Sequence, residues 1–186
     1  AASAGALVEG ATPGTKLLVG GQLTNLNGGI DSQDLFTYTG GTVISRSSSM
    51  VVRQNSTATS GPLGVGGAVD IFGTLQVYDN GNLRNVAGTA NAYTVNLHPG
   101  SVLWLDNDAV NVTNRWDDAT AVNLNGGQLY LQSRNDAAVT STETVGAINY
   151  SRGSSLRVNR RITNGAVQLT VADLTRAGVG STLAIV

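Results

Sequence analysis

Apolar and polar residues alternate in four short segments that recur at nearly constant intervals along the chain. The segments begin at Val69, Val95, Val122 and Ile148, which lie 26, 27 and 26 positions apart. Each continues with an apolar residue two positions later, as expected for a strand with one buried face. A glycine and a second alternating pair follow in every unit: Leu75/Val77, Leu103/Leu105, Leu129/Leu131 and Leu156/Val158. The pattern therefore predicts repeated pairs of strands joined at glycine corners.

A unit of this length cannot bury its own apolar face and needs a neighbour on each side. The sequence therefore predicts an all-β fold, a right-handed parallel β-helix (β-solenoid) with coils of about 26 residues. The right hand follows from the general bias of crossovers between parallel strands. The four leading residues should form one interior column.

The repeat also predicts how the chain is organised. We expect regular coils over 68–186 within a single solenoid domain that spans 15–186. An early strand pair is expected at Leu17/Val19 and Leu23, and an inserted loop around 55–67. Residues 1–14 are small and contain glycine and proline, so we expect a flexible or strand-donating N-terminal arm.

Less regular segments should form a third side of each coil, at 83–86, 110–112 and 138–144. Asn or Asp residues recur just beyond the second strand of each unit, and stacked side chains of this kind can form a ladder. The candidates for such a ladder are Asp79-Asn80, Asp106-Asn107, Asn135-Asp136 and Asn159.

Composition excludes several classes of protein. The chain of 186 residues has no cysteine, so disulfides, zinc-thiolate sites and thiol catalysis are excluded. Its net charge of −1 argues against nucleic acid as a partner, and no apolar run approaches the 18 residues of a membrane-spanning helix. A single lysine, Lys16, and abundant Gly, Asn and Thr are more typical of an exported fibrous protein. We expect an extracellular or cell-surface location.

Three stretches have a familiar composition and spacing: 114–129 (NRWDDATAVNLNGGQL), 141–148 (STETVGAI) and 169–176 (LTVADLTR). They resemble the repeats of bacterial autotransporter-associated β-strand proteins, which are large surface or secreted proteins. The resemblance covers about residues 68–186. It implies a right-handed parallel β-helix at the bacterial cell surface with an adhesive or scaffolding role, and it supplies no catalytic motif.

Candidate chemical sites are few, and we predict no catalytic residue and no cofactor. His98 is the only histidine and follows a strand at a corner, where a solvent-facing position is expected. The densest acidic group is a weak candidate for calcium, which needs several converging oxygen ligands, or for the carboxylate pair of a glycosidase. That group is Asp106, Asp108, Asp117 and Asp118. Trp104 and Trp116 are candidates for stacking on sugar rings.

Charge is divided unevenly along the chain. Residues 146–186 hold five arginines against Asp173, a net of +4, while residues 1–145 hold six basic and eleven acidic groups, a net of −5. This distribution predicts either a solvated basic face or a rod with one positive end and a negative remainder, which would favour contact from head to tail. The candidate residues for self-association are Leu7 and Val8 of the arm, Leu183, Ile185 and Val186 of the last strand, and Arg157, Arg160 and Arg161.

These observations predict a non-enzymatic extracellular structural subunit that self-associates from head to tail into a surface fibre or matrix. The partner would be further copies of the same chain, with surface glycans as a second class of partner. The alternatives are a carbohydrate-binding or carbohydrate-cleaving β-helix protein and a passenger fragment of an adhesin.

Overall fold

The computed structural model describes residues 16–20, 22–24, 39–53, 63–64, 67–83 and 93–186. These residues form strands, turns and connecting segments, with no helix among them. The predicted N-terminal arm at 1–14, with Leu7 and Val8, lies outside the described residues, as does most of the predicted loop at 55–67.

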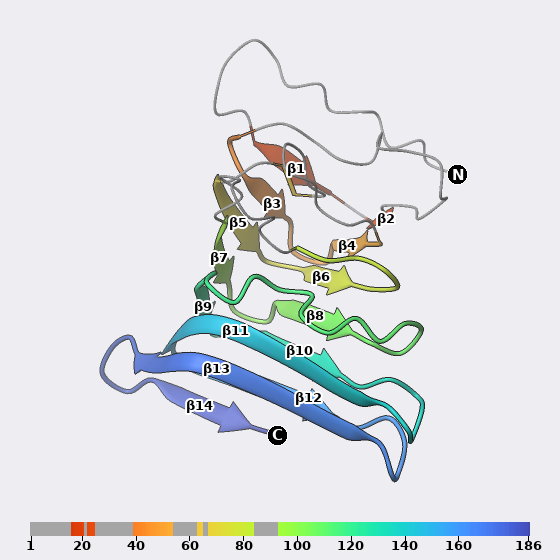
Figure 1. Cartoon of the computed structure of the whole chain (residues 1–186). Helices are drawn as coiled ribbons and strands as arrows, with labels where there is room; N and C mark the ends of the chain where they lie inside the picture. The colour runs from red at the N-terminus through yellow and green to blue at the C-terminus, as the bar shows by residue number, and fades with distance from the viewer. Residues whose placement is uncertain (1–15, 21, 25–38, 54–62, 65–66, 84–92) are drawn as a thin grey trace.

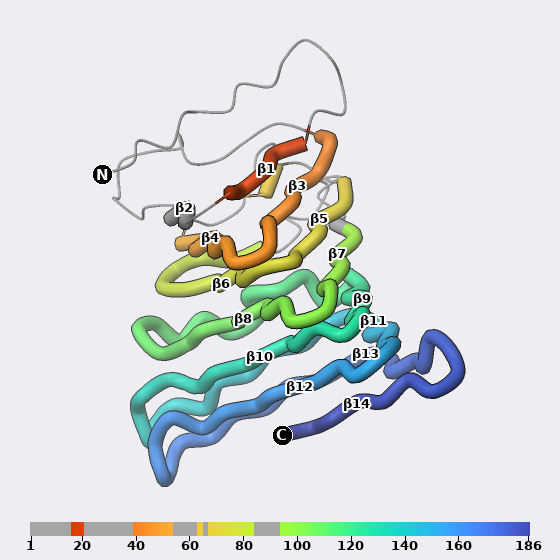
Figure 2. The backbone as a smooth tube through the Cα atoms, turned by 180° about the vertical axis from the view of Figure 1, so that it is seen from behind, coloured from red at the N-terminus to blue at the C-terminus, as the bar shows by residue number. Residues whose placement is uncertain are grey.

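The strands of these described residues form two parallel sheets of seven strands each, and the chain alternates between the sheets at every corner (Figure 1). Sheet A contains β1 (Leu17–Val19), β3 (Thr42–Ile44), β5 (Gly67–Ile71), β7 (Tyr93–Leu97), β9 (Val122–Asn125), β11 (Thr140–Ser151) and β13 (Ala166–Arg176). Sheet B contains β2 (Gln22–Thr24), β4 (Ser49–Val52), β6 (Thr74–Val77), β8 (Val102–Asp106), β10 (Gln128–Gln132), β12 (Gly153–Asn159) and β14 (Thr182–Ile185). The coils stack along one axis from β1 to β14, as both views of the backbone show (Figures 1 and 2).

The predicted interior column is present in sheet A. Val69 pairs with Val95, Val95 with Val122, and Val122 with Ile148, always between parallel strands. All four side chains are fully buried. The parallel β-solenoid with coils of about 26 residues is thus confirmed, and so is the early strand pair, which corresponds to β1 and β2.

Sheet B supplies the opposite wall of the core. Leu75, Leu103, Leu129 and Leu156 form a second column through direct pairing of their strands, and each is at most 5% exposed. A buried aliphatic side chain of this size stabilises a fold by roughly 1.5–3 kcal/mol. Because the columns run along the whole axis, each coil depends on the coils next to it for most of its burial.

One predicted boundary is wrong. The third segment at 138–144 is continuous with the strand that follows it, since β11 runs from Thr140 to Ser151 as one strand. Its parallel partner β13 pairs with it from Thr140 to Tyr150 and supplies hydrogen bonds over this length. The inward positions at its start are the buried polar residues Ser141 and Glu143, which is why apolar alternation did not reveal a strand there.

The corners between sheet A and sheet B have unequal lengths. Four residues join β3 to β4 and β7 to β8, at 45–48 and 98–101, whereas two residues join β5 to β6, at 72–73. The short corner is therefore recessed between two longer ones. Gly73 makes this possible, because a Cβ atom at this position would overlap the carbonyl oxygen of Ser48 in the adjacent corner.

Candidate functional site

A row of amide side chains runs along the outward face of sheet A. The side-chain amide of Asn96 donates to Asp70 Oδ1 at 2.9 Å, Asn123 donates to Asn96 at 2.9 Å, and Asn149 donates to Asn123 at 3.0 Å. The four residues occupy one register position in β5, β7, β9 and β11. We call them the amide row. It is a ladder of the kind expected from the sequence, but at other residues.

The residues predicted to form the ladder do not do so. Asp79 pairs with Arg53 at 2.8 Å, and Asp106 accepts hydrogen bonds from Gln76 and Gln132. Asp79 lies beyond the end of β6, in a connecting segment. Asp106 is the last residue of β8 and is in register with Gln132 of β10 and Asn159 of β12, but only the contact from Gln132 to Asp106 is a direct hydrogen bond between them. Positions inside paired strands keep a constant register, so only they bring amides directly over one another.

The outward face of sheet B carries an aromatic row. The rings of Trp104 and Tyr130 are stacked with centroids 5.4 Å apart, and the Arg157 guanidinium lies 4.7 Å from the Tyr130 centroid. Trp104 and Arg157 flank Tyr130 in the register of β8, β10 and β12, so they cover its two faces. Trp116 is 1% exposed. Of the two tryptophans predicted to stack on sugar rings, Trp116 is therefore inaccessible, and Trp104 is half-buried with one face against Tyr130.

A buried polar cluster stabilises the third side of the solenoid. Arg115 is fully buried, and its guanidinium donates to Asn107 Oδ1 at 2.7 Å and to the carbonyl oxygens of Gly81, Asp79 and Val110 at 2.6–2.8 Å. One side chain thereby connects the third sides of two successive coils. Burial lowers the pKa of Arg115 to about 10, and the guanidinium remains charged at neutral pH.

Glu143 belongs to the same cluster. It is 2% exposed, and its two carboxyl oxygens accept the backbone N–H groups of Arg115 at 2.7 Å and Trp116 at 3.0 Å. Burial raises the pKa of Glu143 to about 7, an effect that these two hydrogen bonds partly offset. A carboxyl group with such a pKa is typical of a general acid or base. Here both oxygens are buried and bonded to the backbone, which favours a structural role.

The pKa of Glu143 predicts that the protein loses stability as pH rises from about 4.5 to 7. In this window the folded protein binds more protons than the unfolded chain, so the free energy of unfolding decreases with pH. A shift of this size corresponds to about 3 kcal/mol. Urea unfolding at pH 5 and pH 8 should show this loss for the wild type and a smaller one for Glu143→Gln. Equal losses for the two proteins would contradict the assignment.

The acidic residues proposed for calcium are not brought together. Among the described residues, no group of three or more His, Asp or Glu side chains could hold a metal ion. Asp106 is 3% exposed, and burial raises the pKa of its carboxyl group. Asp108 pairs with Arg161 at 3.2 Å, and Asp117 accepts the backbone N–H of Ala119 within its own turn.

His98 is half-buried at the corner after β7. Its ring is stacked on Phe72 with centroids 3.8 Å apart, and Nε2 lies 3.4 Å from Asp70 Oδ1. The histidine thus contacts the first residue of the amide row. The expected solvent-facing position is only partly correct, because Phe72 covers one face of the imidazole.

The coil formed by β13 and β14 presents apolar side chains to solvent. Leu174 pairs with Ile148 in the interior column of sheet A, yet it is 44% exposed. Ile185 pairs with Leu156 in the column of sheet B and is 71% exposed. We call the surface made by these two side chains, together with Val186, the end face. The C-terminus lies at this end of the stack (Figure 2).

The arginines predicted to take part in self-association lie beside the end face. Arg157, Arg160 and Arg161 are all exposed. Arg157 lies over Tyr130 and Arg161 pairs with Asp108, so two of the three have partners within the chain. Leu183 is half-buried, whereas Ile185 and Val186 are exposed.

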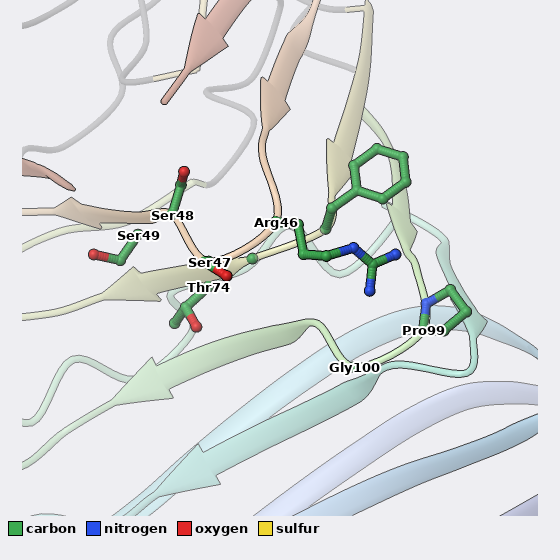
Figure 3. Close-up of a pocket in the computed structure, with 9 residues that line it drawn as sticks. Arg46, Ser47, Ser48, Ser49, Thr74, Pro99 and Gly100 are labelled. Carbon is green, nitrogen blue, oxygen red and sulfur yellow. The ribbon is translucent and has the colours of Figure 1, made fainter. Parts of the chain in front are cut away.

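A hollow of about 360 Å³ lies over the recessed corner between β5 and β6. Its floor is formed by 72–74, one wall by 46–49, and the other wall by Pro99 and Gly100. Figure 3 shows the Arg46 side chain extending toward the Pro99 side, with Thr74 on the opposite side. We call this hollow the corner pocket.

The sequence interpretation did not identify the corner pocket. The signal was available in the unequal spacing between paired strands, since four residues separate Ile44 from Ser49 but only two separate Ile71 from Thr74. A shorter corner between longer ones is recessed and leaves a hollow. The repeat pattern shows the glycine that the corners share and does not show this difference in length.

No protein-family model matches the chain, and no curated protein or solved structure was found to be similar to it. The described residues contain no helix that is long and apolar enough to cross a membrane.

Proposed function

We propose that this protein is a non-enzymatic structural subunit that associates from head to tail with copies of itself into an extracellular fibre or matrix. The observation that carries the proposal is the end face. Leu174 and Ile185 continue two columns whose other members in the neighbouring coils are buried. A further coil placed against them would extend the same core.

The physical basis is strand addition at the end of a parallel stack. Among the strands that the structure describes, the outer strands β13 and β14 each have one paired edge and one edge without a partner strand. Such edges accept another strand through backbone hydrogen bonds, which do not require a particular sequence. A second copy supplies such a strand, and because the contact joins unlike surfaces it extends into a filament.

Charge does not add to this contact. Residues 146–186 carry the net +4 given above, but the net −5 of the remainder lies in 68–145, while residues 1–67 hold three basic and three acidic groups. The proposal therefore rests on the apolar columns and the strand edges of the end face.

Two further observations support a role without catalysis and outside the cell. The carboxyl groups with raised pKa, Asp106 and Glu143, are both buried and hydrogen-bonded within the fold. The extracellular location follows from the composition and from the resemblance to autotransporter-associated repeats.

The test is light scattering coupled to size-exclusion chromatography over a range of protein concentrations, with electron microscopy of the same samples. We expect the mass of the wild-type protein to rise with concentration and filaments to form. Leu174→Lys combined with Ile185→Lys should keep the protein monomeric, because the substitutions place two charges on the apolar contact.

Val179→Lys is the matched control. Val179 is fully exposed but lies in the turn between β13 and β14, outside both columns. This variant should associate as the wild type does. A wild-type protein that stays monomeric at every concentration, or equal association by the double variant, would contradict the proposal.

A further inference from the structure

We propose that the corner pocket binds an anionic sugar residue of an extracellular polysaccharide, with Arg46 as the residue that recognises the anionic group. This binding site is separate from the end face. The pocket lies several coils away from it and is lined by residues of 46–49, 72–74 and 99–100.

The shape of the pocket is fixed by the backbone. The two-residue corner at 72–73 cannot fill the space between its longer neighbours, and Gly73 adds no side chain. Ser47 has a φ of 62° and Gly100 a φ of 81°, so each wall contains a left-handed residue that turns its corner. The volume of about 360 Å³ is at the lower end of the range for small-molecule sites. It exceeds the needs of a single inorganic ion.

The pocket contains a cationic side chain, Arg46. Within the described part of the chain, the guanidinium of Arg46 has no hydrogen-bond or ion-pair partner, and the side chain is exposed. Every lining residue in that part of the chain is neutral except Arg46. A guanidinium recognises carboxylate and sulfate groups through paired hydrogen bonds. The ligand should therefore carry such a group.

The remaining lining residues favour a sugar as the carrier of the anion. The hydroxyl groups of Ser47, Ser49 and Thr74 also lack partners among the described residues and can bond to sugar hydroxyls. Phe72, held in place by stacking on His98, adds an apolar surface for the C–H groups of a pyranose ring. A cationic group, several hydroxyl groups and one aromatic ring in the pocket together match a ligand that is a uronate or a sulfated sugar.

Isothermal titration calorimetry tests this inference with three probes: trigalacturonate, dextran sulfate and neutral dextran. The protein used carries Leu174→Lys and Ile185→Lys and is expected to be monomeric. The binding result therefore does not depend on whether the end face mediates self-association. We expect one of the two anionic probes to bind, which also identifies the anionic group. We expect neutral dextran to bind at least about tenfold more weakly, because it lacks the charge-assisted hydrogen bond.

Substitutions locate the site. Arg46→Gln should weaken binding about tenfold or more, since it removes the charged donor. Arg160→Gln is the matched control, because Arg160 is also exposed but lies outside the pocket, and the affinity of this variant should be unchanged. Thr74→Val keeps the side-chain volume, removes one hydroxyl group and should weaken binding severalfold.

Three results would overturn the inference: no binding of either anionic probe, equal binding by Arg46→Gln and wild type, or equal binding of neutral dextran. Circular dichroism of each variant verifies that the solenoid is folded. Arg46 is exposed, so its substitution should leave the thermal unfolding midpoint within the range of an ordinary surface change.

Discussion

Replacing Arg115 with methionine is expected to destabilise the protein by about 4 kcal/mol, because a buried donor group is removed from several acceptors at once. The substitution keeps an unbranched side chain in the same space but leaves three carbonyl oxygens without the guanidinium donor, while the Asn107 amide oxygen keeps only its hydrogen bond from the backbone N–H of Val112. Each buried acceptor without a partner costs about 1–3 kcal/mol in the folded state, and local relaxation recovers part of the sum.

Urea unfolding at pH 7 measures this loss, and hydrogen exchange locates it. The amides of 107–121 should lose protection first, because Arg115 connects this segment to the carbonyl oxygens of Gly81 and Asp79 in the preceding coil. Arg160→Met is the matched control, and we expect a change below about 0.5 kcal/mol at that exposed position. Equal stability of the two variants would show that the buried guanidinium does not stabilise the third side.

Leu103→Ala should destabilise the protein by about 3 kcal/mol, within the range found for buried leucines. Leu103 is fully buried between Leu75 and Leu129 in the column of sheet B, so truncation leaves a cavity among side chains from three coils. The neighbouring coils cannot close this cavity without shortening the distance between paired strands.

The same column supplies the control for this prediction. Ile185 occupies the equivalent position in β14, is 71% exposed, and should lose less than about 1 kcal/mol when replaced by alanine in the monomer. Both variants are measured by urea unfolding at low protein concentration. Equal losses at the two positions would contradict the account of the core as a stack supported from both sides.

The fold was predictable because the residues that determine it occur at the same position in successive coils. Val69, Val95, Val122 and Ile148 occupy one position in successive coils, and burial at that position accepts only apolar side chains. The strand at the start of β11 was not predicted, because its inward side chains include Glu143, which is buried only through backbone hydrogen bonds from another segment. An alternation of apolar and polar residues does not indicate an inward position that is occupied by a carboxyl group.

The candidate sites were less predictable for a related reason. The role of Arg115 depends on carbonyl oxygens more than 30 positions earlier, and nothing in the adjacent sequence distinguishes it from a solvated arginine. The amide row was displaced from its predicted place because connecting segments differ in length while strands keep their register. The corner pocket depends on a difference between coils, whereas a search for repeats emphasises what coils share.

The amide row has a polarity that the carboxylate of Asp70 determines. Asp70 can only accept, so Asn96 must turn its NH₂ group toward it, which leaves the Asn96 oxygen to receive the NH₂ group of Asn123, and so on to Asn149. One anion at one end thus sets the orientation of three amide dipoles over four coils. An added coil with asparagine at this position would adopt the same orientation, so the solenoid can be lengthened by whole repeats without an unmatched donor or acceptor within the row.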